Sequence, residues 1–454
     1  MMNLSVKNLL VMLVCSVTLL AAGCKKSSST YYKVKVNISG LIGGGLQLQN
    51  NSVDNLTVNA NGVATFTTQL SNNQTYSVAI LKQPGSPPQT CVLTNPAGTI
   101  SSADVTVTLA CNAIEFAYLV NQAGNSITPL VINETTGALA VNGANIPTGS
   151  VPLALALDPT GRYVYALNSA DNTISSYLGN PANGLLVSAG AALGTGISGP
   201  QSVVVDASGK YVFVANSTAQ TISGFAINPA SGTLSSIGTP ASNSCLSSPA
   251  GAVPPVGQVF CSLASVSSNG NNYLYVTNPT ANSISEYVIS AGTLTAPATI
   301  ATGSTPAAIV TTPASAKLGP FAYVVNSADA TVTSYAINAG SLVSTGTIST
   351  GGTNPLAMAV SPNGQYAYVV NNSSNTIAAF SIASNGTLLS LGAVVGTGNG
   401  PKSVSVEPKG GFAYVANFSD NTVSVYPINA NGTLAAPTVQ SLGNNALAII
   451  TSAN

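Results

Sequence analysis

Histidine and tryptophan are absent from this 454-residue chain, and charged side chains are scarce, with 11 Lys and Arg and 11 Asp and Glu. Charged residues thus make up 5% of the chain, against roughly 25% in an average soluble protein. The lack of histidine excludes the usual general base, the usual zinc ligand and every catalytic triad built on an imidazole. The low charge argues against coiled coils and basic nucleic-acid binders, so we expect no nucleic-acid partner.

Chain length sets the next limit. A single hydrophobic core rarely serves a chain of 454 residues, so we expect either two domains or one large repetitive architecture. The hydrophobic fraction of 45% is ordinary for a globular protein. The composition therefore limits catalysis and charge-driven recognition. It does not limit the formation of an apolar core.

The first residues have the pattern of a targeting signal. Lys7 precedes a 14-residue apolar run over residues 9–22, which is too short to span a bilayer as a finished helix and is typical of a signal-peptide core. We predict a signal peptide over residues 1–23. The run ends in Leu-Ala-Ala-Gly-Cys at residues 20–24, which resembles the bacterial lipobox, whose Cys receives a lipid before cleavage.

That resemblance implies a lipid on Cys24 and a lipoprotein tether over residues 24–31. An ordinary secretory signal with an incidental Cys24 is the alternative. Lys25, and not Asp, follows the predicted lipidation site, and resemblance to Gram-negative sorting then favours the outer membrane. We expect a lipid-anchored protein that faces the periplasm or the cell surface, with the membrane as its first partner.

The remaining cysteines predict disulfides. Cys15 lies inside the signal peptide, which leaves Cys91, Cys111, Cys245 and Cys261. Three pairings are open in principle, and local pairing within 91–111 and within 245–261 is the most economical. Each bridge would contribute about 3 kcal/mol and would need an oxidising compartment. A four-thiolate metal site is the alternative, but no CxxC spacing supports it, so we expect no metal and no cofactor.

Alternating polar and apolar residues dominate residues 32–111. Runs such as YKVKVNIS, VATFTTQL and DVTVTLAC have period two and are separated by Asn, Gly, Pro and Ser, which predicts strands and turns. We therefore predict a small β-sandwich domain over residues 32–111. The pattern resembles a sandwich module found near the start of bacterial surface lipoproteins, which implies a spacer or a binding module.

Residues 112–454 repeat one pattern seven times. Each copy has an aromatic strand that ends in Asn, an Asn-rich turn, a strand of the form TISxY and a Gly before a fourth segment. An example is YVYALNSADNTISSYLGNPANGLL from Tyr163. An inner strand precedes each copy after the first, as in LALALDP from Leu153. Four antiparallel strands in each repeat predict a propeller blade.

The two ends of the repeat region predict how the ring closes. The first copy, from Phe116, has no inner strand before it, whereas ALAIITSAN from Ala446 follows the seventh copy with no aromatic strand after it. The C-terminal strand is therefore expected to complete the first blade and to leave no open edge. The predicted fold is all-β, a seven-bladed β-propeller over residues 112–454 closed by a C-terminal strand and preceded by the sandwich.

The repeated Asn and aromatic positions are interpreted as structural. We expect each Asn to hydrogen-bond turn backbone at its strand end, and not to belong to a ring of ligand-binding amides. We expect the aromatic side chains to pack between blades. The seven Asn positions are 121, 168, 216, 278, 326, 371 and 417.

The aromatic strands also carry a family resemblance. YVTN at residues 275–278, YVVN at 323–326 and 368–371, and YVAN at 414–417 resemble the YVTN repeat. Proteins with this repeat include surface-layer propellers and the seven-bladed lactonase family that contains 6-phosphogluconolactonase. The resemblance covers essentially all of residues 112–454 and specifies a blade better than a chemistry.

Turn membership sorts the charged residues of the propeller between its two faces. Turns between first and second strands carry Arg162, Lys210, Lys317 and Lys409 together with Asp158, Asp206 and Glu407, and DPTGR and DASGK suggest local pairing. The other face is expected to receive Lys402, Asp171, Asp329 and Asp420 as its candidate ligand residues. A calcium site from these carboxylates is a weak alternative, since each belongs to a different blade.

A phosphosugar lactonase would gather Arg, Lys and His around its central mouth, and this face is expected to carry one Lys. No catalytic residue is therefore assigned. Our leading hypothesis is a monomeric, lipid-anchored propeller that serves as a rigid platform for a protein or carbohydrate partner. The alternatives are a divergent lactonase-like hydrolase that uses carboxylates and Tyr, and a structural surface-layer component.

Overall fold

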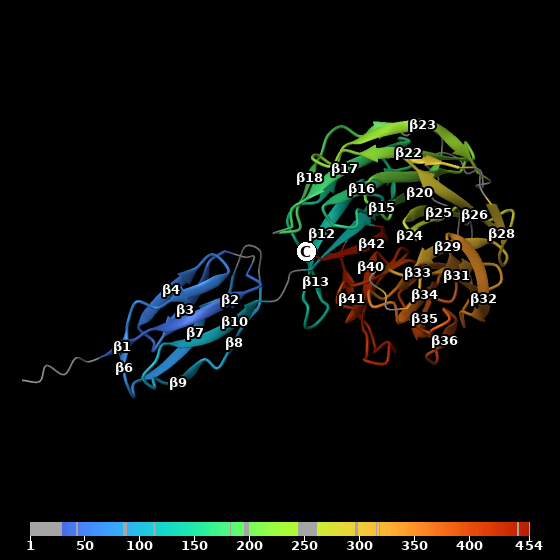
Figure 1. Cartoon of the computed structure of the whole chain (residues 1–454). Coiled ribbons are helices and arrows are strands. Elements are labelled where there is room, and N and C mark those ends of the chain that lie inside the picture. Colours follow the sequence, from blue (N-terminus) through green and yellow to red (C-terminus); the bar gives the residue numbers. More distant parts are fainter. Residues whose placement is uncertain are drawn as a thin grey trace, which may run out of the picture. The chain divides into compact units, whose positions relative to one another are not determined.

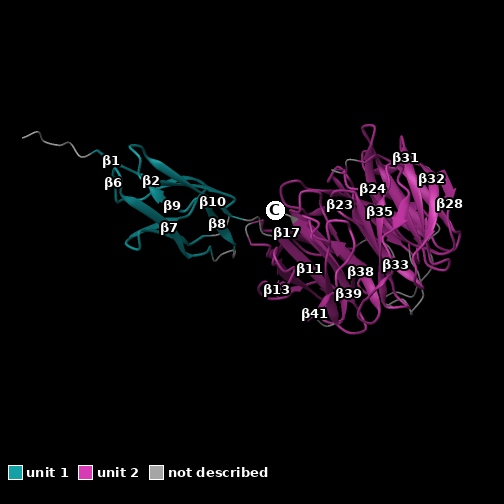
Figure 2. Cartoon of the chain, turned by 90° about the horizontal axis from the view of Figure 1, so that it is seen from below, with its two compact units in different colours: residues 1–112 teal, residues 113–454 magenta. Residues whose placement is uncertain are grey.

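The computed structural model describes residues 30–41, 44–84, 89–111, 115–181, 183–194, 199–243, 261–295, 298–314, 316, 318–442 and 445–453. The predicted signal peptide, Cys24 and Cys245 lie outside these residues. The chain divides into two compact units, Met1–Asn112 and Ala113–Asn454 (Figure 2). Within the described ranges, no helix has the length and hydropathy needed to cross a membrane.

Unit 1 is built from two four-stranded sheets, with the strand orders β5-β2-β10-β8 and β4-β3-β7-β9, and a short β1-β6 pair. Strands β2 and β10 pair in parallel, and the other strands pair antiparallel. The strands are β1 (Tyr31–Tyr32), β2 (Val34–Ser39), β3 (Leu46–Asn50), β4 (Asp54–Val58), β5 (Gly62–Thr65), β6 (Leu70–Ser71), β7 (Thr75–Lys82), β8 (Cys91–Thr94), β9 (Ala97–Thr99) and β10 (Val105–Cys111).

Period-two alternation explains the core of this unit. In β2, Val34, Val36 and Ile38 are buried while the residues between them are polar. These side chains join Leu46 and Leu48 of β3 in one hydrophobic cluster that both sheets share. The predicted β-sandwich is therefore present, since each sheet turns its apolar face toward the other.

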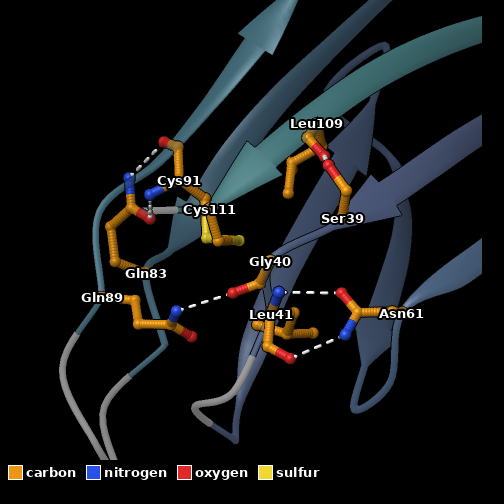
Figure 3. Close-up of a disulfide and its surroundings, with 9 residues drawn as sticks. All are labelled: Ser39, Gly40, Leu41, Asn61, Gln83, Gln89, Cys91, Leu109 and Cys111. Atoms are coloured by element: carbon orange, nitrogen blue, oxygen red, sulfur yellow. Dashed lines mark hydrogen bonds between the residues drawn. A yellow bond between two sulfur atoms is a disulfide. The ribbon is translucent and has the colours of Figure 1, made fainter. Parts of the chain in front are cut away.

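A disulfide ties two neighbouring strands of the sandwich (Figure 3). Cys91 of β8 and Cys111 of β10 lie opposite each other in the strand register and are bonded at an S–S distance of 2.05 Å. The Gln83 side chain hydrogen-bonds both the N–H and the carbonyl of Cys91, at 2.9 and 3.0 Å. The predicted 91–111 bridge thus lies in a hydrogen-bonded setting. Cys261 is also disulfide-bonded, and its predicted partner Cys245 lies outside the described residues.

The described residues of unit 2 form seven sheets in meander order, which are the blades of a propeller (Figure 1); three have four strands, and four have a fifth because the outer strand is in two pieces. Each inner strand contacts the inner strands of the two neighbouring blades, so the seven form a closed ring around the axis. The inner strands are β42 (Ala446–Ala453), β15 (Pro152–Leu157), β20 (Pro200–Val205), β24 (Leu263–Ser268), β29 (Pro306–Thr311), β33 (Pro355–Val360) and β38 (Pro401–Val406).

The middle strands are buried because neighbouring blades cover both of their faces. The second strands are β11 (Glu115–Asn121), β16 (Tyr163–Asn168), β21 (Tyr211–Asn216), β25 (Asn271–Asn278), β30 (Phe321–Asn326), β34 (Tyr366–Asn371) and β39 (Phe412–Asn417). The third strands are β12 (Ser126–Ile132), β17 (Thr173–Gly179), β22 (Thr221–Ile227), β26 (Ser283–Ser290), β31 (Thr331–Asn338), β35 (Thr376–Ile382) and β40 (Thr422–Pro427).

The outer strands are short or divided in five blades, whereas β23 (Leu234–Ser242) and β32 (Ser341–Ser349) are continuous over nine residues each. A Gly with positive φ, Gly190 in the second blade and Gly392 in the sixth, lies where the expected fourth strand divides into two pieces. The outer strands are β13 (Leu139–Val141), β14 (Ile146–Pro147), β18 (Leu186–Ser188), β19 (Leu193–Gly194), β23 (Leu234–Ser242), β27 (Thr293–Leu294), β28 (Ala298–Ala301), β32 (Ser341–Ser349), β36 (Leu388–Ser390), β37 (Val395–Gly396) and β41 (Thr438–Ser441).

The C-terminal strand closes the ring, as the orphan strand from Ala446 predicts. Strand β42 pairs antiparallel with β11 over nearly its whole length, from Glu115 opposite Ala453 to Asn121 opposite Ala446. In Figure 1 the red C-terminal strand lies against the teal strands of the first blade. The first blade is therefore made from both ends of the repeat region, and its inner edge is paired.

Tyrosine hydroxyls join neighbouring blades at six of the seven joints. Tyr118 of the first blade donates to the carbonyl of Gly184 in the second at 3.1 Å. Gly184 has φ +67°, and a Cβ there would lie 2.3 Å from the Phe116 ring, which explains the Gly of each repeat. At the joint between the third and fourth blades the equivalent residue is Phe213, which has no hydroxyl. The other latches are Tyr165–Gly232, Tyr275–Gly340, Tyr323–Gly386, Tyr368–Gly432 and Tyr414–Gly137.

The repeated Asn side chains are structural, but their partners differ from the expected ones. Asn168 donates to the hydroxyls of Thr173 and Ser175 on the next strand, at 3.0 and 2.9 Å, and the other six Asn residues repeat this pattern with a Thr or Ser of their own blade. Turn backbone was the expected partner, and backbone carbonyls are additional acceptors for two of the seven: Asn216 donates to Val214 and Thr221 at 3.2 Å, and Asn371 to Thr350 at 3.4 Å. The strand register places the hydroxyls nearer, since the Asn lies at the last paired position before the turn.

Candidate functional site

A cavity of about 470 Å³ lies on the propeller axis, lined by residues from all seven inner strands or from the residues that lead into them. Most of the lining comes from the first half of each inner strand, and Asn372 adds a side chain from the turn after β34, so the cavity belongs to the face at which the inner strands begin. We call this the front face, and we call the face at which they end the back face. The candidate residues Lys402, Asp171, Asp329 and Asp420 belong to loops and strand starts of the front face.

Strand register identifies seven equivalent positions around this cavity. In the second blade, for example, Leu155 pairs with Ala166 in the middle of the second strand, and Leu153, two residues earlier, begins the cavity lining. The same pairing identifies one such residue in every blade. We call these positions the axial ring. Its members are Leu153, Gln201, Cys261, Ala307, Leu356, Lys402 and Leu447.

The axial ring is therefore mostly apolar and contains one charged residue. The deeper lining continues the apolar character with side chains such as Leu155, Ile309, Met358 and Ile449. No Asp, Glu or Arg is among the residues that line the cavity, and the chain contains no His. The amides of Gln201 and Asn372 and several serines add polar groups to the lining. The cavity can therefore bind a ligand by apolar contact, by hydrogen bonds and through one ammonium group.

Lys402 is half-buried at the start of β38, and its Nζ lies 4.1 Å from the centre of the Phe418 ring. A cation over an aromatic face is stabilised by the ring quadrupole. Burial lowers the pKa of the Lys402 ammonium from its usual value. Neither ion pair in the described part of the chain involves Lys402. The ammonium group thus faces the cavity without a neighbouring carboxylate.

The three predicted carboxylates lie on the front face but do not converge on Lys402. Each is exposed and accepts a backbone N–H from the loop before its own inner strand: Asp171 from Ser150, Asp329 from Ser304 and Asp420 from Asn399, at 2.5 to 2.6 Å. Hydrogen bonds from Asn399 hold the pKa of Asp420 below its usual value. These residues fix the loops at the rim of the cavity.

The calcium alternative gains no support. Asp171, Asp329 and Asp420 belong to the second, fifth and seventh blades, and each bonds within its own blade. Over the described ranges, no group of three His, Cys, Asp or Glu side chains has a spacing that could hold a metal ion.

The predicted local pairing on the back face is absent from the described ion pairs. Asp158 accepts the backbone N–H of Tyr163 at 2.6 Å, and Arg162 lies over the Tyr163 ring at 5.1 Å. Asp206 likewise accepts the backbone N–H groups of Lys210 and Tyr211 at 2.8 Å. The Asp residues bond backbone in these tight turns, so the cations remain available to solvent and to aromatic faces.

A buried carboxyl pair on the back face was missed by sequence reasoning, which found no paired carboxylates. Glu115, the first residue of β11, and Glu407, just after β38, are each 2% exposed. The two carboxyl groups are neighbours, and the charge of Glu407 adds to burial in raising the pKa of Glu115, so a proton on one member of the pair is favoured. They meet where the seventh blade joins the first.

Burial and the neighbouring Glu407 carboxylate raise the pKa of Glu115 to about 7, against the opposing effect of Lys409. Burial also raises the pKa of Glu407, although the Gly411 N–H bond opposes that shift. Lys409 pairs with Glu134 of the first blade at 2.6 Å. Two carboxyls with one proton resemble a catalytic dyad in chemistry, but neither Glu115 nor Glu407 lines the axial cavity.

Comparison with known proteins agrees with this architecture. The family model "Lactonase, 7-bladed beta-propeller" matches residues 82–196 and 338–446. No curated protein matches the chain. A structure from Bacteroides uniformis, assigned provisionally as a 6-phosphogluconolactonase, is similar with a TM-score of 0.63 and 21% identity, over 75% of this chain and 100% of that one.

Two further solved structures have the same likeness. One, from Bacteroides fragilis and with the same provisional assignment, has a TM-score of 0.61 and 21% identity over 75% of this chain and 98% of that one. The other, a periplasmic gluconolactonase of Pseudomonas aeruginosa, has a TM-score of 0.61 and 20% identity over 74% and 98%. At these identities the likeness shows the fold. The family match and these structures together show that this chain has the fold of the lactonase-like seven-bladed β-propellers.

Proposed function

We propose that this chain is a lipid-anchored protein of the bacterial cell envelope whose propeller binds a ligand in the axial cavity. The observation that carries the binding role is the cavity itself, which is lined by all seven blades and contains one cation among apolar and uncharged polar side chains. Ligand sites are typically concave and mainly apolar with a few placed polar groups. The ring of inner strands would hold such a site rigidly, because every strand is paired.

Among the described residues, the front face lacks the clustered cations and the general base that lactone hydrolysis would use. A millionfold acceleration requires about 8 kcal/mol of transition-state stabilisation, usually from placed donors, cations and a general base. The cavity offers Lys402 alone, and the carboxyl pair Glu115–Glu407 is buried away from it on the other face. We therefore favour binding over hydrolysis.

A lactonase-like hydrolase is the second candidate, because the family match and two structures assigned provisionally as 6-phosphogluconolactonases favour it. The test is turnover of 6-phosphogluconolactone and glucono-1,5-lactone by the purified chain, against spontaneous hydrolysis. We expect no acceleration by wild type or by Lys402→Ala. The matched control is Lys210→Ala, which removes an exposed cation from the back face. Turnover that Lys402→Ala abolishes and Lys210→Ala preserves would overturn the binding proposal.

The anchor is tested separately. Cys24→Ser should leave the chain unprocessed or release it from the membrane fraction, since the proposed lipid is attached to that sulfur. Cys15→Ser, inside the signal run, is the control and should be processed normally. Membrane fractionation and mass spectrometry of both variants provide the measurement. Unchanged mass and unchanged membrane association of Cys24→Ser would refute the anchor and leave the cavity proposal intact.

A further inference from the structure

The axial ring distinguishes Lys402 from every other residue at its level. The six equivalent positions carry Leu153, Gln201, Cys261, Ala307, Leu356 and Leu447. Five of these lack a charged or amide group, and Gln201 is neutral. A ligand in the cavity therefore meets one positive charge on one side and apolar surface over most of the rest.

The ammonium group of Lys402 is partly removed from water and has no countercharge to offset the loss of its hydration. Burial alone accounts for the lowered pKa of its ammonium group, and no carboxylate contributes. Phe418 offers the ammonium group a ring face but no countercharge. Burying an unpaired charge is expensive, and a bound anion would offset that cost. The cavity is therefore complementary to a negatively charged group near Lys402.

The backbone beside Lys402 decides which anion fits. Asn399 donates its N–H to Asp420 at 2.6 Å, Gly400 donates its N–H to Asn375 at 2.9 Å, and Pro401 has no N–H. Residues 399–401 thus offer no free backbone N–H for the several oxygens of a phosphate, which proteins bind with Arg forks or clusters of backbone N–H groups. A single ammonium group suits a singly charged carboxylate.

The remaining lining decides the body of the ligand. Leu153, Leu356 and Leu447 of the axial ring and Ile309 and Met358 below them present hydrocarbon to the cavity. Polar side chains also line the cavity, but most of them are hydrogen-bonded within the protein: Asn372 to Pro401, Ser262 to Ile309, Ser403 to Ile449 and Ser405 to Thr451. A sugar would therefore find few free partners for its hydroxyls there, at a cost for each one left unpaired. A volume of about 470 Å³ falls within the range of sites for small organic molecules.

We propose that the axial cavity binds a monocarboxylate with an apolar body, with its carboxylate on Lys402 and its hydrocarbon against the leucines of the axial ring. This inference rests on the proposed binding function and names the ligand class for it. It separates this propeller from one that binds phosphorylated sugars.

The experiment compares two probes that differ in charge and hardly in shape, 4-phenylbutyrate and 4-phenylbutanamide, by titration calorimetry on the purified full chain. We expect the carboxylate to bind at least tenfold more tightly than the amide. Lys402→Met should remove that preference while leaving the amide affinity unchanged. The control Lys210→Met, which removes a cation from the back face, should leave both affinities unchanged. Ala307→Phe, which fills the axial ring, should abolish binding of both probes.

Three outcomes contradict the inference in different ways. Equal affinity for the two probes in wild type, with both lost in Ala307→Phe, would refute the carboxylate class and preserve the binding function. Tighter binding of 6-phosphogluconate than of 4-phenylbutyrate would refute the apolar body and favour the lactonase alternative. Absence of binding by all three compounds, with Ala307→Phe as stable as wild type, would refute both the ligand class and the axial site.

Discussion

The sandwich and the propeller secure their sheets by different means. The sandwich joins β8 to β10 with the Cys91–Cys111 bond and encloses one small core. The propeller has seven cores between blades and closes the ring by pairing β42 with β11. A small domain gains most from a covalent link, because it buries little surface. A ring has no free inner edge once its last strand is in place.

The buried carboxyl groups of the two units also differ, in the direction in which their pKa values are shifted. In the sandwich, burial would raise the pKa of Asp54, but hydrogen bonds from Thr68 and Thr67 hold it below its usual value. In the propeller, Glu115 and Glu407 face each other and their pKa values are raised. The sandwich therefore favours an ionised carboxylate, and the seam of the propeller favours a protonated pair.

Deletion of residues 446–454 should have the largest effect and should be confined to the propeller. It leaves β11 without its inner partner and opens the contacts of Ile449, which is 1% exposed in the core between the first and seventh blades. We expect loss of cooperative folding or aggregation of unit 2. Hydrogen exchange read separately over the two units measures this, and protection in the sandwich should be unchanged.

Removing only residues 452–454 is the control, since β11 keeps its partners from Ala446 to Thr451. Its propeller should remain folded. A soluble and equally protected propeller in the longer deletion would show that closure by β42 is not needed.

Removal of the Cys91–Cys111 disulfide from the sandwich should have the second-largest effect on stability. Replacing Cys91 and Cys111 by Ala removes a link across 20 residues, and the chain-entropy estimate gives a loss of about 3 kcal/mol. Denaturant unfolding followed by exchange within residues 32–111 measures it. The propeller should keep wild-type protection. An unchanged sandwich would mean that its core alone suffices.

The pH dependence of the propeller's free energy of unfolding should be a smaller effect than loss of the bridge. Its sign should be opposite to that of the sandwich. The raised pKa of Glu115, about 7 when folded, means that the protonated pair stabilises the fold fully below the unfolded value near 4.5. This stabilisation is lost as the pH rises through 7, by roughly 1 to 3 kcal/mol. Native-state exchange corrected for intrinsic rates, at pH 5 and pH 8, measures it.

Glu115→Gln sharpens this comparison, because its amide can donate to Glu407 at any pH, as the protonated acid does. The variant should lose the stability difference between pH 5 and pH 8. In the sandwich, Asp54 should give no change over that range and should destabilise the unit only as the pH falls below about 4. Equal pH responses of wild type and Glu115→Gln would exclude the carboxyl pair as their cause.

Local pattern was enough to predict most of the fold. Period-two alternation predicted the sandwich, the sevenfold repeat predicted the blades, and the orphan strand from Ala446 predicted closure, which the β11–β42 pairing confirms. These features depend on residues close in sequence or on a counted repeat. Meander order also placed Lys402 and the three Asp side chains on one face, because each turn of a blade alternates between faces.

The tertiary structure alone decided which of those groups meet. Asp171, Asp329 and Asp420 bond their own loops, while Lys402 reaches the axis, and no turn assignment distinguishes these two outcomes. Glu115 and Glu407 come from the first and the last blade, so their contact exists only after the ring has closed. The sequence determines which side chains each blade carries. Closure of the ring determines which of them are buried together, and burial of two carboxyl groups side by side favours a proton on one of them.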